Sequence, residues 1–318
     1  MNSFFEIRDI SVYRSELMGW SILWIMMLHF TFNQIAPLGF VAQYGFAGVD
    51  IFMLVSGLGL YYSLCKRKNI LQFYKKRLLR IVPTYYVLGF VSNLLFCHDT
   101  ILEYLFRYST IGFWTGGIYW EWYIPSIIML YLISPFLKNM FDRRMIMILF
   151  VLCISILIIA YYLIDKGHII DRTHFFFLYR IPEFIFGMTC AHCIKNNVSS
   201  KYFIALLAAG IPFFVVLFPH HHQIYNYKYF SLLFLLPFFT LVFIMVSKNI
   251  KCLNPIMRKI GDASLEIYLI QGMFFYALIN HLIVIPPIWH DTISVALMVF
   301  CCIIGITIHW VRERCSPS

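Results

Sequence analysis

Long apolar runs separated by short polar clusters dominate the 318-residue chain. A helix needs about 20 mostly apolar residues to cross the hydrocarbon core of a bilayer. Runs of this length predict ten membrane-spanning helices, at residues 16–36, 46–64, 81–97, 118–137, 145–164, 174–194, 202–218, 229–247, 263–285 and 292–311. The stretch 98–117 is also apolar, but its charged and glycine residues favour an interfacial or re-entrant segment. The expected fold is therefore an all-α polytopic membrane bundle.

The composition supports this reading, because the chain is 61% hydrophobic and only 13% charged. A soluble domain is nearer one quarter charged. No stretch is left for a separate soluble domain of ordinary size, so we expect one membrane domain over residues 1–318. The N-terminal MNSFFEIRDISVYR lacks the apolar core and cleavage site of a signal peptide, so the first span should stay inserted.

Lysine and arginine residues are distributed very unevenly between the predicted loops. With the N-terminus inside, 20 of the 25 fall on the inner side, four on the outer side, and Arg180 within a span. Cytoplasmic loops of membrane proteins carry this excess of positive charge. Both termini should therefore be cytoplasmic, and the net charge of +10 does not indicate a nucleic-acid partner.

A few polar residues lie within the predicted spans, where they are costly and should face the bundle interior. His29 closes the stretch GWSILWIMMLHF, roughly 20 Å from the inner edge at about 1.5 Å per helical residue. Arg180 and Glu183 lie at a similar depth and, three residues apart, share a helix face. Asp50 enters near the outer end of the second span.

Two interpretations of these residues remain open. They could form a polar cluster that only holds helices together. Alternatively, His29 could be a general base whose tautomer is fixed by a carboxylate.

A basic stretch precedes the third predicted span, in the loop CKRKNILQFYKKRLLRIVP at residues 65–83. Lys76 or Arg77, together with Arg80, would line one helix face. Anionic lipid headgroups and a phosphorylated cofactor such as coenzyme A are both suitable ligands for such a face.

Metal and redox chemistry are disfavoured. Cys190 and Cys193 form a single C-x-x-C late in an apolar run, with no second pair of ligands. The histidines at 220–222 have no carboxylate or cysteine beside them. We therefore expect no metal.

Six segments resemble, in the correct order, motifs of the family-3 membrane acyltransferases. They are SELMGWSILWIMMLHF, FAGVDIFMLVSGLGL, FYKKRLLRIVPTYY, WYIPSIIMLYLISPFL, YRIPEFIFGM and GDASLEIYLIQ. Members of this family have about ten spans and transfer acetyl or related groups to sugars of cell-surface polysaccharides. The resemblance covers most of the chain.

The resemblance implies roles for individual residues. The implied catalytic residues are His29, Asp50, Glu183 and Arg180. The implied acyl-CoA-binding residues are Lys76, Arg77, Arg80 and Arg14. The implied substrate-binding residues are Ser56, Trp122, Tyr123, Tyr268 and Gln271.

Three of the motifs depart from the family pattern. Met18 stands where a basic residue is usual, and Arg14 lies one turn earlier on the same face. Ile127 and Ile128 stand where a glutamate often follows the fourth-span tryptophan, and Gln271 stands where the last motif often ends in histidine.

The resemblance, together with the predicted spans, thus implies an O-acyltransferase in the inner, cytoplasmic membrane of a bacterium. It would move an acetyl or succinyl group from acyl-CoA, most simply acetyl-CoA, to a hydroxyl of a cell-surface polysaccharide or exopolysaccharide. Expected partners are membrane lipid, a polysaccharide or lipid-linked sugar acceptor, and other proteins of polysaccharide biosynthesis. One alternative is a transporter or exporter of such a polysaccharide or precursor. Another, suggested by Met18, Ile127 and Gln271, is an inactive structural partner.

Overall fold

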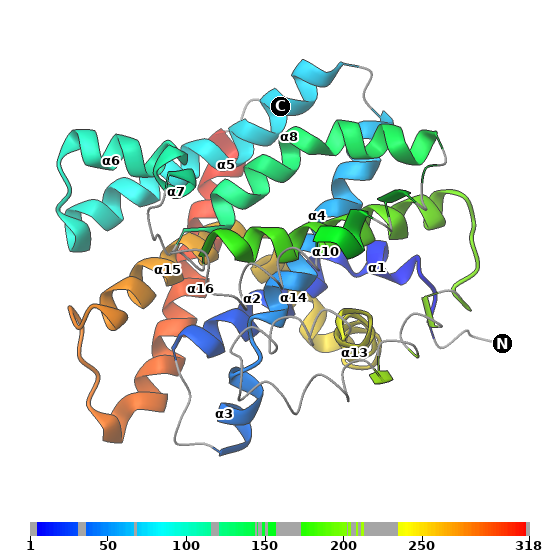
Figure 1. Cartoon of the computed structure of the whole chain (residues 1–318). Helices are drawn as coiled ribbons and strands as arrows, with labels where there is room; N and C mark the ends of the chain where they lie inside the picture. The colour runs from blue at the N-terminus through cyan, green and yellow to red at the C-terminus, as the bar shows by residue number, and fades with distance from the viewer. Residues whose placement is uncertain are drawn as a thin grey trace. The chain divides into compact units, whose positions relative to one another are not determined.

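Helices make up all the regular structure that the computed structural model describes (Figure 1). The described residues are 5–30, 36–66, 69–115, 121–143, 173–201 and 235–315, with short pieces at 145, 148–149, 152–156, 203–204, 208 and 211–212. No strand occurs among them, so the all-α prediction is confirmed for this part of the chain.

The helices follow one another along the chain in two compact units. In order they are α1 (Asp9–Val12), α2 (Arg14–His29), α3 (Ala36–Ala42), α4 (Ala47–Lys66), α5 (Ile70–Ser92), the π-helix η1 (Asn93–Cys97), α6 (Ile101–Tyr108), α7 (Ile111–Trp114), α8 (Tyr123–Asp142), α10 (Thr173–Lys195), α13 (Leu236–Asn249), the 3-10 helix η3 (Lys251–Leu253), α14 (Asn254–Asp262), α15 (Ser264–Ile279), the 3-10 helix η4 (Pro287–Trp289) and α16 (His290–Cys315). The first unit comprises Met1–Arg14, Asp50–Leu78 and Trp122–Lys248. The second comprises Ser15–Val49, Leu79–Glu121 and Asn249–Ser318.

Four helical stretches among the described residues are long and apolar enough to cross a membrane: α4, α5 with η1, α8 and α16. A fifth span would result if α13 and the stretch Lys251–Asp262, which is η3 with α14, crossed the membrane together. The two parts are bent by 93° relative to each other. The predicted number of about ten is therefore not confirmed. The predicted spans at 145–164 and 202–218 lie mostly outside the described residues.

Several predicted helices agree closely with the observed ones, but the third does not. α4, α10 and α16 begin within two residues of the predicted starts. α5 instead begins at Ile70, so most of the stretch predicted as a loop at 65–83 is helical. The reason is Asn69, whose side-chain oxygen accepts hydrogen bonds from the backbone N–H groups of Leu71, at 2.9 Å, and Gln72, at 3.3 Å. This satisfies amide donors that a helix start leaves unpaired.

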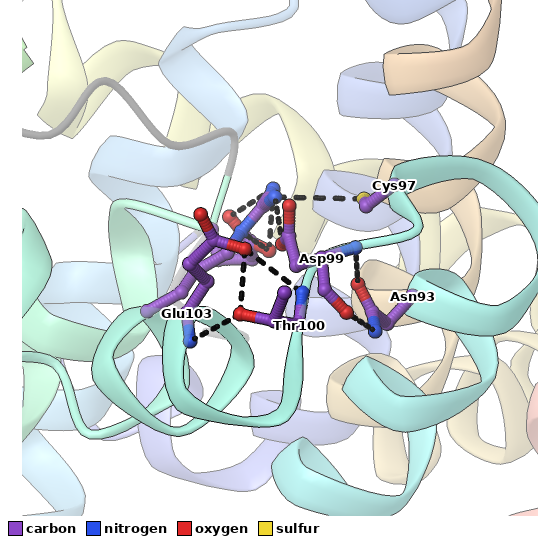
Figure 2. A network of polar contacts seen from close by, with 7 residues as sticks. Asn93, Cys97, Asp99, Thr100 and Glu103 are labelled. Carbon is purple, nitrogen blue, oxygen red and sulfur yellow. Dashed lines mark hydrogen bonds and ion pairs between the residues drawn. The ribbon is translucent and has the colours of Figure 1, made fainter.

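The stretch 98–115 forms two short helices, α6 and α7, neither long enough to span a membrane. Figure 2 shows how side chains hold the turn before α6. The Asn93 amide accepts from the backbone N–H of Asp99 at 2.9 Å and donates to its carbonyl at 3.0 Å. Thr100 and Glu103 then form a reciprocal capping box at the start of α6. Hydrogen bonds from the side chain and backbone of Thr100 lower the pKa of Glu103, so the box loses strength only as the pH falls into the acid range.

α4 and α10 cross in the first unit with their backbones in direct contact. A Cβ atom on Gly57 of α4 would meet the carbonyl of Phe184, and one on Gly187 of α10 would meet the carbonyl of Leu54. Small residues allow membrane helices to approach this closely, and van der Waals contact then stabilises the pair. The contact explains Gly57 in the segment FAGVDIFMLVSGLGL and Gly187 in the segment YRIPEFIFGM.

The second unit is held at several places by polar contacts between helices. Arg258 of α14 forms a 2.6 Å hydrogen-bonded ion pair with the buried carboxylate of Glu16. The hydroxyl of Ser294 in α16 donates to the backbone carbonyl of Phe30 at 2.9 Å. α15 and α16 also lie side by side, where a Cβ on Gly305 would meet the Ile267 side chain (Figure 1). These contacts hold α2 against the C-terminal helices.

Gly57→Ala should destabilise the protein by about 1–3 kcal/mol, because the new methyl group overlaps backbone atoms that cannot easily move. The midpoint of thermal unfolding in a fixed detergent measures this effect. Gly59→Ala is the matched control on the same helix, since its Cβ would lie 3.4 Å from the flexible Arg14 guanidinium. Equal unfolding midpoints for the two variants would contradict the proposed crossing.

Candidate functional site

A buried charge cluster lies in the first unit, between α4 and α10. Arg180 forms ion pairs with Asp50 and with Glu183, and its Nη1 lies 3.1 Å from Glu183 Oε1. None of the three side chains is more than 5% exposed. The indole of Trp122 lies over the guanidinium, with 5.7 Å between Cζ and the ring centroid. The structure thus joins four of the predicted site residues.

The spacing of the motifs explains why these charges meet. Asp50 lies seven residues before Gly57 on α4, and Arg180 lies seven residues before Gly187 on α10. Seven residues are close to two helical turns, so each charge and its glycine share one helix face. The glycines bring those two faces into contact, and the charges on them must then pair.

The chemical capacity of this cluster follows from its charge count. One guanidinium faces two carboxylates, so the group carries one excess negative charge when all three are ionised. Removing the cation would leave two uncompensated buried charges, which is strongly unfavourable. The arrangement ties α4 to α10 and also holds charged groups at fixed positions. It therefore fits both interpretations that the sequence left open.

His29 lies in the second unit, at the C-terminal end of α2, and it contacts α15. Its Nδ1 lies 2.7 Å from Oε1 of Gln271. Its ring stacks on Phe275, with 4.2 Å between ring centroids and 19° between the planes. Gln271 and Phe275 are four residues apart on α15, so they share a face. A hydrogen bond and a ring contact thus fix the imidazole on two sides.

The partner on Nδ1 defines the tautomer of the neutral ring. An amide oxygen can only accept a hydrogen bond, so Nδ1 is the donor in this contact, and in the neutral ring Nε2 keeps its lone pair. Nε2 makes no hydrogen bond to the described residues. A neutral imidazole in this state can accept a proton, which is the first requirement of a general base.

The predicted acyl-CoA-binding residues are on two helices. Lys76, Arg77 and Arg80 all lie on α5, and Lys76 is exposed while both arginines are half-buried. Arg77 lies over the ring of Phe73, 5.9 Å from its centroid. Arg14 begins α2 and packs against Gly59. The cations of the basic motif are therefore accessible along a regular helix.

The remaining predicted substrate-binding residues lie on three helices: Tyr123 on α8, Ser56 on α4 and Tyr268 on α15. Tyr123 begins α8 and packs edge-on against Phe52, two residues after Asp50, at 6.2 Å. Ser56 immediately precedes Gly57 and is half-buried. Tyr268 is half-buried on α15, one turn before Gln271. Their role in substrate binding stays a prediction.

The predicted contact between His29 and the carboxylates of Asp50 or Glu183 would join residues of different units. This contact stays a prediction. Within its own unit, the orienting partner of His29 is Gln271.

A second buried charge cluster, in the second unit, was not predicted as a site (Figure 2). Arg107 pairs with the buried Glu121 at 3.1 Å and with the more exposed Asp99 at 3.4 Å. It also contacts Cys97 Sγ at 3.5 Å and lies over the Tyr276 ring. Burial alone would lower the pKa of Arg107, but the carboxylate of Glu121 raises it above the ordinary value. The cluster fastens α6 to the chain before α8.

Sequence reasoning missed Phe275 and Glu121. Phe275 could have been found from its i+4 spacing to Gln271, which places it on the same helix face. Glu121 directly precedes the motif residue Trp122, whereas the family pattern directed attention to positions after it, where Ile127 is buried in the core. An acidic residue at the start of an apolar run was the available signal.

No group of three or more His, Cys, Asp or Glu residues that could hold a metal occurs among the described residues. Cys190 is buried and Cys193 is half-buried, and both are free thiols. The histidines at 220–222 lie outside the described part of the chain.

Glu121→Gln should lower stability by about 3–5 kcal/mol, because Arg107 stays buried while its most buried counter-charge is removed. Thermal unfolding in detergent tests this. Glu103→Gln, at an exposed carboxylate nearby, is the control and should cause a much smaller decrease. A Glu121→Gln protein as stable as the control would show that the ion pair is dispensable.

Comparison with known proteins identifies the family. A family model described as an acyltransferase domain matches residues 17–307. "Putative acetyltransferase ORF330" of Acidianus two-tailed virus is 25% identical over 198 residues, which cover 58% of this chain and 58% of that protein. The chain therefore aligns with little more than half of this curated relative. No solved structure matches. Because the family model covers most of its length, the chain belongs to acyltransferase family 3, as its six ordered motifs predicted.

Proposed function

We propose that this protein is a membrane-embedded O-acyltransferase in which His29 is the general base. The observation that carries the proposal is the Nδ1 contact with Gln271, which leaves the Nε2 lone pair of a partly exposed histidine unused. Because the chain belongs to an acyltransferase family, the reaction in which this histidine is proposed to act as a base is acyl transfer.

The proposed chemistry is acyl transfer from a thioester to an alcohol. His29 Nε2 removes the proton from an acceptor hydroxyl as its oxygen attacks the thioester carbonyl carbon. The resulting tetrahedral oxyanion collapses, the carbon–sulfur bond breaks, and the imidazolium returns its proton to the thiolate. The products are an ester and a free thiol, and the histidine is restored.

The proposed acyl donor is a cytoplasmic acyl-CoA, most simply acetyl-CoA. Lys76, Arg77 and Arg80 would meet its phosphates, since ammonium and guanidinium groups on a helix suit a polyphosphate. Arg14 is assigned the same role from the motif pattern. Succinyl-CoA would be accepted by the same phosphate contacts.

The proposed acceptor is a hydroxyl of a cell-surface polysaccharide or exopolysaccharide sugar, or of a lipid-linked precursor. Ser56, Trp122, Tyr123 and Tyr268 are proposed to contact it. As the motif pattern predicted, Asp50 or Glu183 is proposed to orient the His29 imidazole, and Arg180 to hold that carboxylate or to stabilise negative charge that develops during transfer. The protein would lie in the inner membrane of a bacterium with both termini cytoplasmic, alongside other proteins of polysaccharide biosynthesis.

His29→Ala should abolish acyl transfer, because it removes the Nε2 lone pair of the proposed base. The measurement is the O-acyl content of surface polysaccharide by NMR in cells carrying the variant, with protein levels matched. His281→Asn is the control, because His281 is exposed and its left-handed backbone suits asparagine. Unchanged acylation in His29→Ala cells would exclude the proposed base. Chemically unchanged polymer trapped inside knockout cells would instead favour a transporter.

Single alanine substitutions at Lys76, Arg77 and Arg80 should each raise the KM for acyl-CoA by about tenfold or more, since each removes a charge-assisted contact. The kcat at saturating donor should change little. Lys259→Ala, at an exposed cation on α14, is the control. If only binding of vesicles with anionic lipid weakens, while KM stays constant, the basic face binds headgroups and not the donor.

A further inference from the structure

Gln271 is a buried amide with only half of its hydrogen-bonding capacity used. Its side chain is 0% exposed, and Oε1 is occupied by His29 Nδ1. Its Nε2 is buried and has no hydrogen-bond partner among the described residues. Buried polar groups are nearly always paired, so a vacant amide nitrogen calls for an explanation.

A purely positional role does not account for this vacancy. An acceptor for Nδ1–H could be supplied by groups that bring no unused donor, such as a backbone carbonyl or a carboxylate. Gln271 instead carries two N–H bonds on Nε2, the atom at the other end of the amide whose Oε1 contacts His29. The stacked Phe275 ring further restricts the imidazole, so the two polar side chains stay in register.

We propose that Gln271 has two roles in acyl transfer, one for each end of its amide. Oε1 positions His29 by accepting the Nδ1 hydrogen, and Nε2 donates a hydrogen bond to the acyl carbonyl oxygen of the bound donor. This inference rests on the proposed function, in which His29 Nε2 is the base.

The donor role adds a contact that strengthens during the reaction. When the acceptor oxygen attacks the carbonyl carbon, the π electrons of the carbonyl bond move onto the carbonyl oxygen. This oxygen then becomes an oxyanion. A fixed N–H donor stabilises that charge more strongly than the neutral carbonyl, so the contact accelerates the step and does not merely bind substrate. The charge returns to the carbon–oxygen bond when the thiolate leaves, and Gln271 gains or loses no proton.

Three variants at this position separate the two roles. Gln271→Met has similar length and provides neither hydrogen bond. Gln271→Glu, when ionised, keeps an oxygen for the His29 Nδ1–H but has no N–H. Gln271→His has one nitrogen donor and one nitrogen acceptor, so it can restore both contacts in part.

The assay is acyl transfer by the full-length protein in detergent, with acetyl-CoA as the donor and, as the acceptor, surface polysaccharide purified from cells that lack the protein. At a pH where the new carboxylate is ionised, Gln271→Glu should lower kcat on the order of 10²–10³-fold, with the KM for acetyl-CoA within threefold of wild type. Gln271→Met should lose at least as much, and Gln271→His should recover at least about tenfold over Gln271→Met.

Nitrogen-15 NMR of histidine-labelled protein gives the independent readout. The His29 signal, assigned by its absence in His29→Ala, should retain the Nδ1–H tautomer in Gln271→Glu and lose it in Gln271→Met. Thermal unfolding and acetyl-CoA binding verify that each variant is folded.

Two results would overturn the inference while leaving the proposed function intact. A Gln271→Glu protein within threefold of wild-type kcat would exclude the donor role of Nε2. A Gln271→Met protein within threefold would exclude both roles. Full activity in His29→Ala would instead remove the proposed function on which the inference rests.

Discussion

The pairing of Arg180 with two carboxylates is the interaction on which the first unit depends. A guanidinium in an apolar helix bundle is tolerable only with an opposite charge beside it. Asp50 meets that demand from another helix, and Glu183 meets it from the same helix one turn away. The crossing of α4 and α10 is therefore constrained in rotation as well as in distance, because turning either helix would separate the charges. The glycines at the crossing allow the two backbones to approach closely, and the charge pairs determine which helix faces are in contact.

In the second unit, the same constraint acts through neutral hydrogen bonds as well as through ions. His29 is held by an amide and an aromatic ring rather than by a charge, and its second nitrogen makes no hydrogen bond to the described residues. Arg107, in contrast, is fully committed to Glu121 and Asp99. The first arrangement leaves Nε2 of His29 without a hydrogen bond in the part of the chain that the structure describes. In the second, the Arg107 guanidinium is paired and holds a helical turn in place. This difference separates a candidate catalytic group from a structural one.

Much of this could be predicted from the sequence, and the exceptions have physical causes. Apolar run length predicted α4, α10 and α16 well, because the bilayer fixes the length of a span. The pairing of Arg180 with Glu183 followed from their spacing, and Asp50 was a candidate from its place in the second predicted span as well as from the family motif. The early start of α5 was missed because it depends on a single cap, Asn69, within a strongly basic stretch. The partner of His29 was missed because 242 residues separate it from Gln271, and no periodic pattern encodes such a contact.

The early start of α5 has a consequence for the thermodynamics of the anion binding proposed for its basic residues. Because the helix is already formed from Ile70, the angular spacing of Lys76, Arg77 and Arg80 is set before any anion arrives. A loop would have to lose backbone entropy on binding, at roughly 1–2 kcal/mol for each residue that it orders. The backbone of the helix has already lost this entropy during folding. A larger part of the free energy of each ionic contact would therefore contribute to the affinity for an anion. A rigid row of cations also favours one ligand with phosphates at fixed separation over separate, laterally mobile headgroups.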